Sequence, residues 1–195
     1  MLSKEALDAF KKQYKEEHGK ELSDDEALAI ALHENAILHT QKFIPAIEKE
    51  IGEIDSDTKS RLAEDISSFF LSLIFIYLGW DKKFDNLRPL VLKEYEKFIK
   101  DNSGAINEGQ GRTIHNFLID KLRDNIMWLS TPFEKRAVVD KIASAIKIAL
   151  GVSGRISRFG HDYKPIVELF VYNTELSMYH FGIISEATNK GKLFY

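Results

Sequence analysis

The chain has 195 residues and a net charge of −3, and 44% of its residues are hydrophobic while 29% are charged. This balance excludes a disordered or fibrous protein and is typical of one globular domain with a substantial core. The absence of cysteine excludes disulfide bonds and thiolate zinc or iron–sulfur sites. Because the first residues are charged throughout and contain no apolar signal-peptide segment, we expect a cytoplasmic protein.

Residues 1–40 predict an amino-terminal helical hairpin that packs on a main domain at 41–195. Apolar side chains recur every four residues in its first helix, at Ala6, Phe10 and Tyr14. Ser23 and Glu26 then form a capping box, in which each side chain satisfies the other residue's free backbone N–H. The second helix is expected to break or kink at Pro45, with a short helix at 46–51 after it.

An apolar run, ISSFFLSLIFIYLGW, follows at residues 66–80. A membrane-spanning helix needs about 20 apolar residues and a buried strand usually ends after about 4–8, whereas this run has fifteen residues that include three serines. We therefore predict one helix over 57–78 that is buried on nearly all sides. Ser56 or Asp57 is expected to cap its start, and Gly79 is expected to end it in the left-handed conformation.

Proline and glycine divide the rest of the chain. Asn86 can cap a helix that has Pro89 in its first turn, and the segment 101–111, with three glycines, predicts a flexible connection. Three more helices are predicted. The first covers 112–130, and the second starts at a capping box at 131–134 and ends near Gly151. The third runs from 165 through 183 and is closed by residues 189–191. The fold class is therefore all-α, a single compact bundle of seven or eight helices around the 57–78 helix.

Charge is unevenly distributed along the sequence. Residues 1–111 carry 15 Lys and Arg against 22 Asp and Glu, whereas residues 112–164 carry 10 against 5. The simpler interpretation is that these are two solvated helix faces that attract each other. The alternative is a basic surface for anions or nucleic acid. The sequence lacks a dense run of Lys and Arg, and the net charge is unfavourable for phosphate binding, so nucleic acid is not the favoured partner.

The loop 151–165 concentrates polar side chains before a helix N-terminus, which itself favours anions. Arg155 and Arg158 can bind phosphate while His161 moves a proton, so these residues and Asp162 are candidate catalytic residues. The spacing of Arg155 and His161 resembles the R-x(4–6)-H motif of HEPN ribonucleases, and His161 followed by Asp162 is similar to their HD segment. This resemblance implies an RNA-cleaving or phosphate-binding helical domain. In the alternative, Asp162 caps the last helix, and the two arginines pair with acidic side chains of the segment 1–111.

Aromatic side chains in and after the central helix suggest a second kind of site. They could hold a fatty acid or a tetrapyrrole, or they could simply pack the core: Phe69, Phe70, Phe75 and Trp80. The six histidines are not spaced as metal ligands, and His33, Glu34 and His39 do not form the H-E-x-x-H motif of zinc proteases. No metal site and no cofactor are predicted.

These observations favour a non-enzymatic binding or regulatory protein that acts through contacts with a protein partner, because that function needs no sequence motif. The first alternative is a sensor of a small apolar ligand in the helical core, and the second is the HEPN-like activity of Arg155 and His161. No serine is marked as an activated nucleophile. No membrane association is expected.

Overall fold

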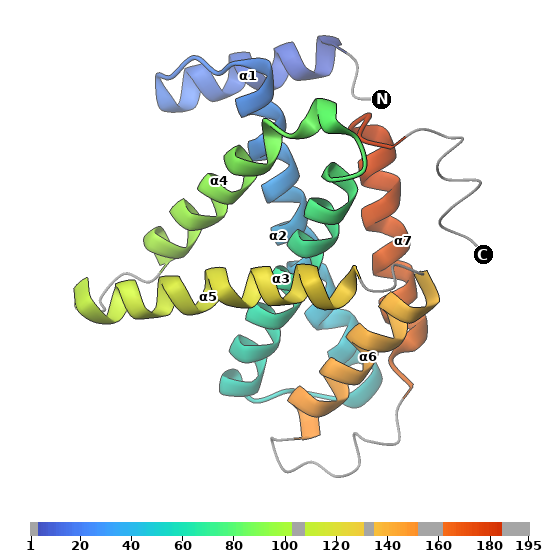
Figure 1. The fold of residues 1–195 in the computed structure, drawn as a ribbon. Coiled ribbons are helices and arrows are strands. Elements are labelled where there is room, and N and C mark those ends of the chain that lie inside the picture. Colours follow the sequence, from blue (N-terminus) through green and yellow to red (C-terminus); the bar gives the residue numbers. More distant parts are fainter. Residues whose placement is uncertain (1–3, 103–107, 131–134, 152–161, 185–195) are drawn as a thin grey trace.

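The computed structural model describes residues 4–102, 108–130, 135–151 and 162–184. These residues form seven α-helices and one short 3₁₀-helix, with no strand among them (Figure 1). The elements are α1 Lys4–His18, α2 Asp24–Ile51, α3 Ser56–Leu78, η1 Lys82–Phe84, α4 Leu87–Asn102, α5 Glu108–Leu129, α6 Lys135–Gly151 and α7 Lys164–His180. The prediction of an all-α bundle of seven or eight helices is confirmed.

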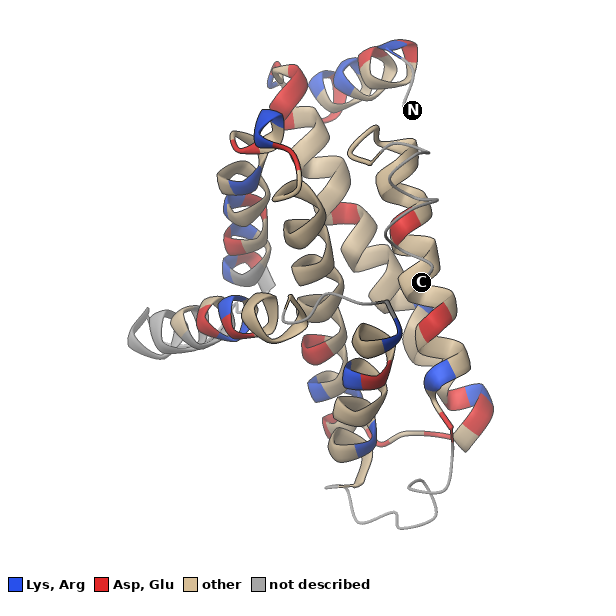
Figure 2. Cartoon of the chain, turned by 45° about the vertical axis from the view of Figure 1, so that its right-hand side comes forward, with Lys and Arg blue, Asp and Glu red and all other residues tan. Residues whose placement is uncertain are grey.

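Helix α3 lies within the bundle and packs against α2, α4, α5, α6 and α7 (Figure 1). Every side chain from 68 to 78 is buried, because an apolar helix of this kind has to be covered on all sides. Charged side chains are spread along α1 and α4, whereas the C-terminal half of α3 carries none (Figure 2). No helix in the described part of the chain is both long enough and apolar enough to span a membrane.

The two ends of α3 differ in detail from the sequence prediction. Asp55, rather than Ser56 or Asp57, is the N-cap residue, and its Oδ1 accepts a hydrogen bond from the N–H of Thr58 at 2.9 Å. Gly79 was expected to be left-handed, but it has a φ of −75° and continues the right-handed turn. Its N–H donates to the carbonyl oxygens of the preceding turn, so the helix ends without a special glycine conformation.

We expect Asp55→Ala to lower the free energy of unfolding by about 1 kcal/mol, because it removes the side-chain acceptor at the start of the central helix. Urea denaturation measures this change. Asp57→Ala removes the same charge from the first turn without removing the cap, so it should cost only a few tenths of that amount. Equal losses in the two variants would show that charge, and not the cap, is what matters.

Helix α2 runs without interruption through Pro45, so the prediction of a separate helix at 46–51 is wrong. Proline removes one hydrogen bond from a helix interior. Here the side chains on either side of it, Phe43, Ile44 and Ile47, are buried and hold the backbone in the helix. Packing therefore outweighs the local preference, and α2 presents one continuous face from its capping box at Ser23 to its end.

Two more helix boundaries differ from the predictions. Helix α5 begins at Glu108 rather than at residue 112. Helix α7 ends at His180, before the expected 183, because Gly182 takes a left-handed φ of 73° and the N–H of Ile183 donates to the carbonyl of Met178 at 2.9 Å. The predicted capping box at 131–134 and the closing residues 189–191 lie outside the described residues.

Helix α5 crosses α3, and polar side chains fix the crossing (Figure 1). Asn125 Nδ2 donates to Ser68 Oγ at 2.8 Å, and Ser68 Oγ donates to the carbonyl of Asp65 at 2.9 Å. Lys121 forms an ion pair with Asp65. This ion pair joins the basic segment 112–164 to the acidic segment 1–111, in line with the simpler interpretation that the two segments attract each other.

Candidate functional site: a groove between α1, α2 and α4

Of the candidate residues in the loop 151–165, only Asp162 is among the described residues, while Arg155, Arg158 and His161 lie outside them. Asp162 is exposed, and its Oδ1 accepts a hydrogen bond from the N–H of Lys164 at 3.0 Å. Lys164 in turn pairs with Asp140 at 2.7 Å, which lowers the pKa of that carboxyl group. Asp162 therefore stabilises the first turn of α7, although the residue at the N-cap position is Tyr163.

The four aromatic candidates do not face one common site. Phe69 lies against Trp128 of α5, and Phe70 lies against Phe43 of α2 and Phe170 of α7. Phe75 lines a small groove beside Arg88. The ring of Trp80 lies edge-on against that of Tyr77. The first three are buried, whereas Trp80 is 37% exposed. Phe69 thus contacts α5, Phe70 contacts both α2 and α7, and Trp80 contacts α3 itself, so these ring contacts do not gather the four side chains around one site.

A larger groove lies between α1, α2 and α4, with a volume of about 680 Å³. Its apolar lining is formed by Phe10, Tyr14, Ile30, Ile37, Leu38 and Phe98. Along α2 the lining residues extend from Ile30 to Gln41, a distance of about 16 Å at the rise of an α-helix. Leu38 is 44% exposed, so part of this apolar lining faces solvent.

The wall that α1 contributes to the groove is held by a small cluster. Leu7, Phe10 and Tyr14 of α1 pack against a second apolar cluster, separate from the main core, which consists of Leu22, Ala27 and Ile30. None of the α1 residues is itself buried. The groove therefore has a firm side, formed by α2 and α4, and a lightly anchored side, formed by α1.

Acidic side chains from two helices meet in the groove. Glu34 of α2 and Glu94 of α4 both line it, together with Asp101 and Lys97. Burial, the charge of Glu94 and then the charge of Glu17 raise the pKa of Glu34, and His18 opposes this effect. In the part of the chain that the structure describes, neither Glu34 nor Glu94 takes part in an ion pair. The groove is thus an apolar surface with an excess of negative charge, three carboxylates against the ammonium group of Lys97.

Two buried polar atoms at the groove have no hydrogen-bond partner within the described ranges. They are Nε2 of His33 and Oδ1 of Asn35, and both residues are among those that line the groove. The His33 ring is 5.5 Å from that of Phe98, and burial lowers its pKa to about 4, so His33 is neutral at physiological pH. The described residues contain no group of three or more side chains that could hold a metal ion.

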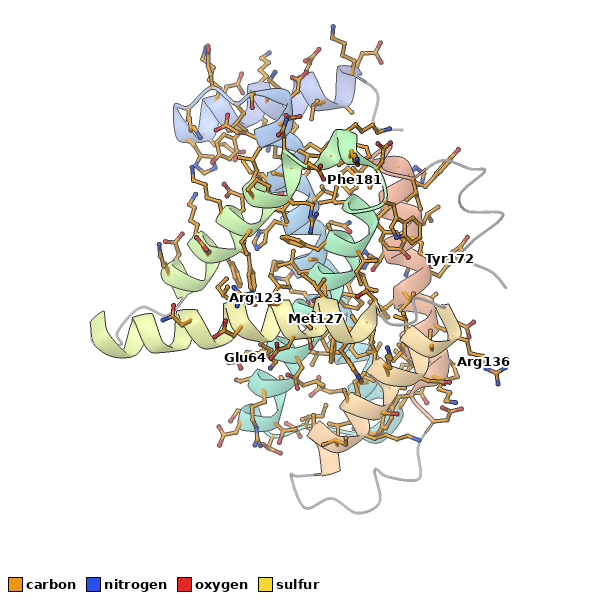
Figure 3. All side chains as sticks on the ribbon, viewed as in Figure 1. Glu64, Arg123, Met127, Arg136, Tyr172 and Phe181 are labelled. Carbon is orange, nitrogen blue, oxygen red and sulfur yellow. The ribbon has the colours of Figure 1, made fainter. Side chains whose placement is uncertain are left out.

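Exposed apolar side chains also occur outside the groove, at Met127, Trp128, Ile148, Leu169, Tyr172 and Leu176. Met127 lies on α5 and Tyr172 on α7 (Figure 3). These residues belong to α5, α6 and α7, none of which lines the groove.

Sequence reasoning missed the groove. It tested His33 and Glu34 only as part of a zinc motif and assigned the faces of α1 and α2 to plain packing. The signal that could have found it is the mixture of Glu34, Asn35 and Leu38 along one stretch of helix.

No protein-family model matches the chain, and neither a curated protein nor a solved structure does so. An all-helical bundle hosts many unrelated functions, so function has to be argued from the site itself.

Proposed function

We propose that the protein is a non-enzymatic binding or regulatory protein and that it acts by holding part of a partner protein in the groove between α1, α2 and α4. The observation that carries this proposal is the groove itself. It has a volume of about 680 Å³ and an apolar lining from three helices, and one lining side chain, Leu38, is 44% exposed. Apolar grooves between helices are a recurring site for amphipathic segments of partner proteins.

A small apolar ligand is the second candidate, because pockets for small molecules have volumes of about 300–1,000 Å³ and the groove falls in that range. Its site would then be this groove, and not the surroundings of Phe69, Phe70 and Phe75. The third alternative, RNA cleavage, depends on Arg155 and His161 outside the described residues, and no contact at the groove supports it.

A substitution at the rim of the groove tests the proposal. Leu38→Asp places a charge on the apolar lining at a position that is already partly exposed, so the fold should tolerate it. Leu169→Asp is the matched control, because Leu169 is 55% exposed and lies on α7, away from the groove. We expect affinity purification with quantitative mass spectrometry to recover protein partners with the wild type and with Leu169→Asp, but not with Leu38→Asp.

Recovery of the same partners by all three proteins would contradict the use of the groove, and recovery of none would contradict a protein-binding function. Thermal unfolding of each variant ensures that a lost partner is not the result of a lost fold. Native mass spectrometry of the unrefolded protein separates the second candidate. Extra mass of small-molecule size, absent after denaturation and absent in Leu38→Asp, would assign the groove to a small ligand instead.

A further inference from the structure

The charge of the groove narrows the chemistry of its ligand. Glu34 and Glu94 come from facing helices, and Asp101 adds a third carboxylate against the single ammonium group of Lys97. Two carboxylates that share a partly buried site repel each other, and a cation placed between them is attracted to both. In the described residues no Lys or Arg forms an ion pair with Glu34 or Glu94, and the nearby Lys20, whose charge is attracted to Glu94, is paired with Glu26.

Two buried acceptor atoms beneath the surface of the groove also favour a positively charged ligand, through their electrostatic field rather than by direct contact. His33 is 7% exposed, and its Nε2, like Oδ1 of Asn35, lacks a partner within the described ranges. The amide oxygen is an acceptor, and a neutral imidazole offers one acceptor nitrogen. The ammonium group of Lys and the guanidinium group of Arg carry donors only, so they complement acceptors and carboxylates together.

Resting on the proposed function, we infer that the ligand is a basic amphipathic helix of a partner protein, with its apolar stripe on Ile37, Leu38 and Phe98 and a Lys or Arg between Glu34 and Glu94. The lined stretch of α2, about 16 Å, equals about three turns of such a helix. An i, i+3, i+7, i+10 stripe, which extends over nearly three turns, presents its apolar side chains to the groove, while the flanking positions of the stripe meet the acidic side chains.

A display library tests this inference with defined probes. Each member is a helix of about 18 residues with a fixed stripe of leucines, and Lys, Glu, Gln or Ser varies at the positions that flank the stripe. The library is depleted on Leu38→Asp and then selected on the full-length wild-type protein. We expect Lys to be enriched over Glu at the flanking positions. The best peptide should bind the Glu34→Gln, Glu94→Gln double variant at least about tenfold more weakly by fluorescence anisotropy.

The double variant Glu50→Gln, Asp57→Asn is the matched control, because it changes the net charge by the same amount at exposed positions outside the groove. It should bind the peptide as the wild type does, and added salt should weaken both complexes. Enrichment of Glu, equal enrichment of all flanking residues, or no enrichment over Leu38→Asp would each overturn the inference. So would a cationic amphiphile, such as dodecylamine, that bound at the groove while every peptide failed.

The two proposals fail in different ways. Partners that are lost from Leu38→Asp but retained by Glu34→Gln, Glu94→Gln would leave the groove as a protein-binding site and overturn only the basic helix. Partners that are retained by Leu38→Asp would remove the site itself.

Discussion

Phe70→Ala is expected to lower the free energy of unfolding by about 3–5 kcal/mol, the largest loss that we predict for one substitution. Phe70 is 2% exposed, and its ring lies 5.9 Å from those of Phe43 and Phe170 and 5.6 Å from that of His39. The truncation therefore leaves a cavity where α2, α3 and α7 meet. It also removes several aromatic contacts at once. Urea denaturation at neutral pH measures the loss.

Phe10→Ala is the matched control for this prediction. It removes the same atoms, but from the small cluster under α1, where the side chain is only partly buried and the surroundings can close more easily. We expect less than half of the Phe70 loss. Comparable losses in the two variants would mean that α1 is as firmly part of the core as α3 is, and the groove would then have two firm sides.

The secondary structure could be predicted well where short-range chemistry decides it. The Ser23 and Glu26 capping box satisfies its own donors, and it starts α2 as expected. The start of α3 is less determined, because Asp55, Ser56 and Asp57 all carry a side-chain oxygen that can cap a helix. In the structure Asp55 has the extended backbone of an N-cap residue and Ser56 is the first helical residue. A local pattern therefore locates such a boundary to within a residue or two.

Predictions failed where distant parts of the chain decide the outcome. Pro45 argues locally for a break, yet Phe43, Ile44 and Ile47 are buried around it and the helix continues. The same limit applies to the site. The groove exists because α1 and α4 lie on either side of one face of α2, and no spacing along the sequence states that Glu34 faces Glu94. A sequence shows which faces are apolar or charged, but not which faces meet.

The stability of the protein is expected to fall steeply between about pH 6.5 and pH 4, because two histidines are buried in an uncharged form. Burial lowers the pKa of His33 to about 4, and burial with the charge of Lys42 does the same for His39. An unfolded histidine takes up its proton near pH 6.5, so at intermediate pH the unfolded chain binds more protons than the folded protein does. The stabilisation is complete above that pH and is lost as pH falls to about 4, on the order of 3 kcal/mol for each histidine.

Replacing both histidines isolates their share of this effect. Such a comparison is needed because carboxyl groups also take up protons near pH 4, and because the raised pKa of Glu34 changes stability in the opposite direction. The double variant His33→Phe, His39→Phe keeps a ring beside Phe98 and Phe70 but carries no proton. Urea unfolding at steps from pH 7.5 to 4.5 should give a flatter profile for it than for the wild type. A double variant with the wild-type slope would mean that His33 and His39 accept protons in the folded state. The groove, which His33 lines, would then gain a positive charge at acidic pH and bind a basic helix more weakly.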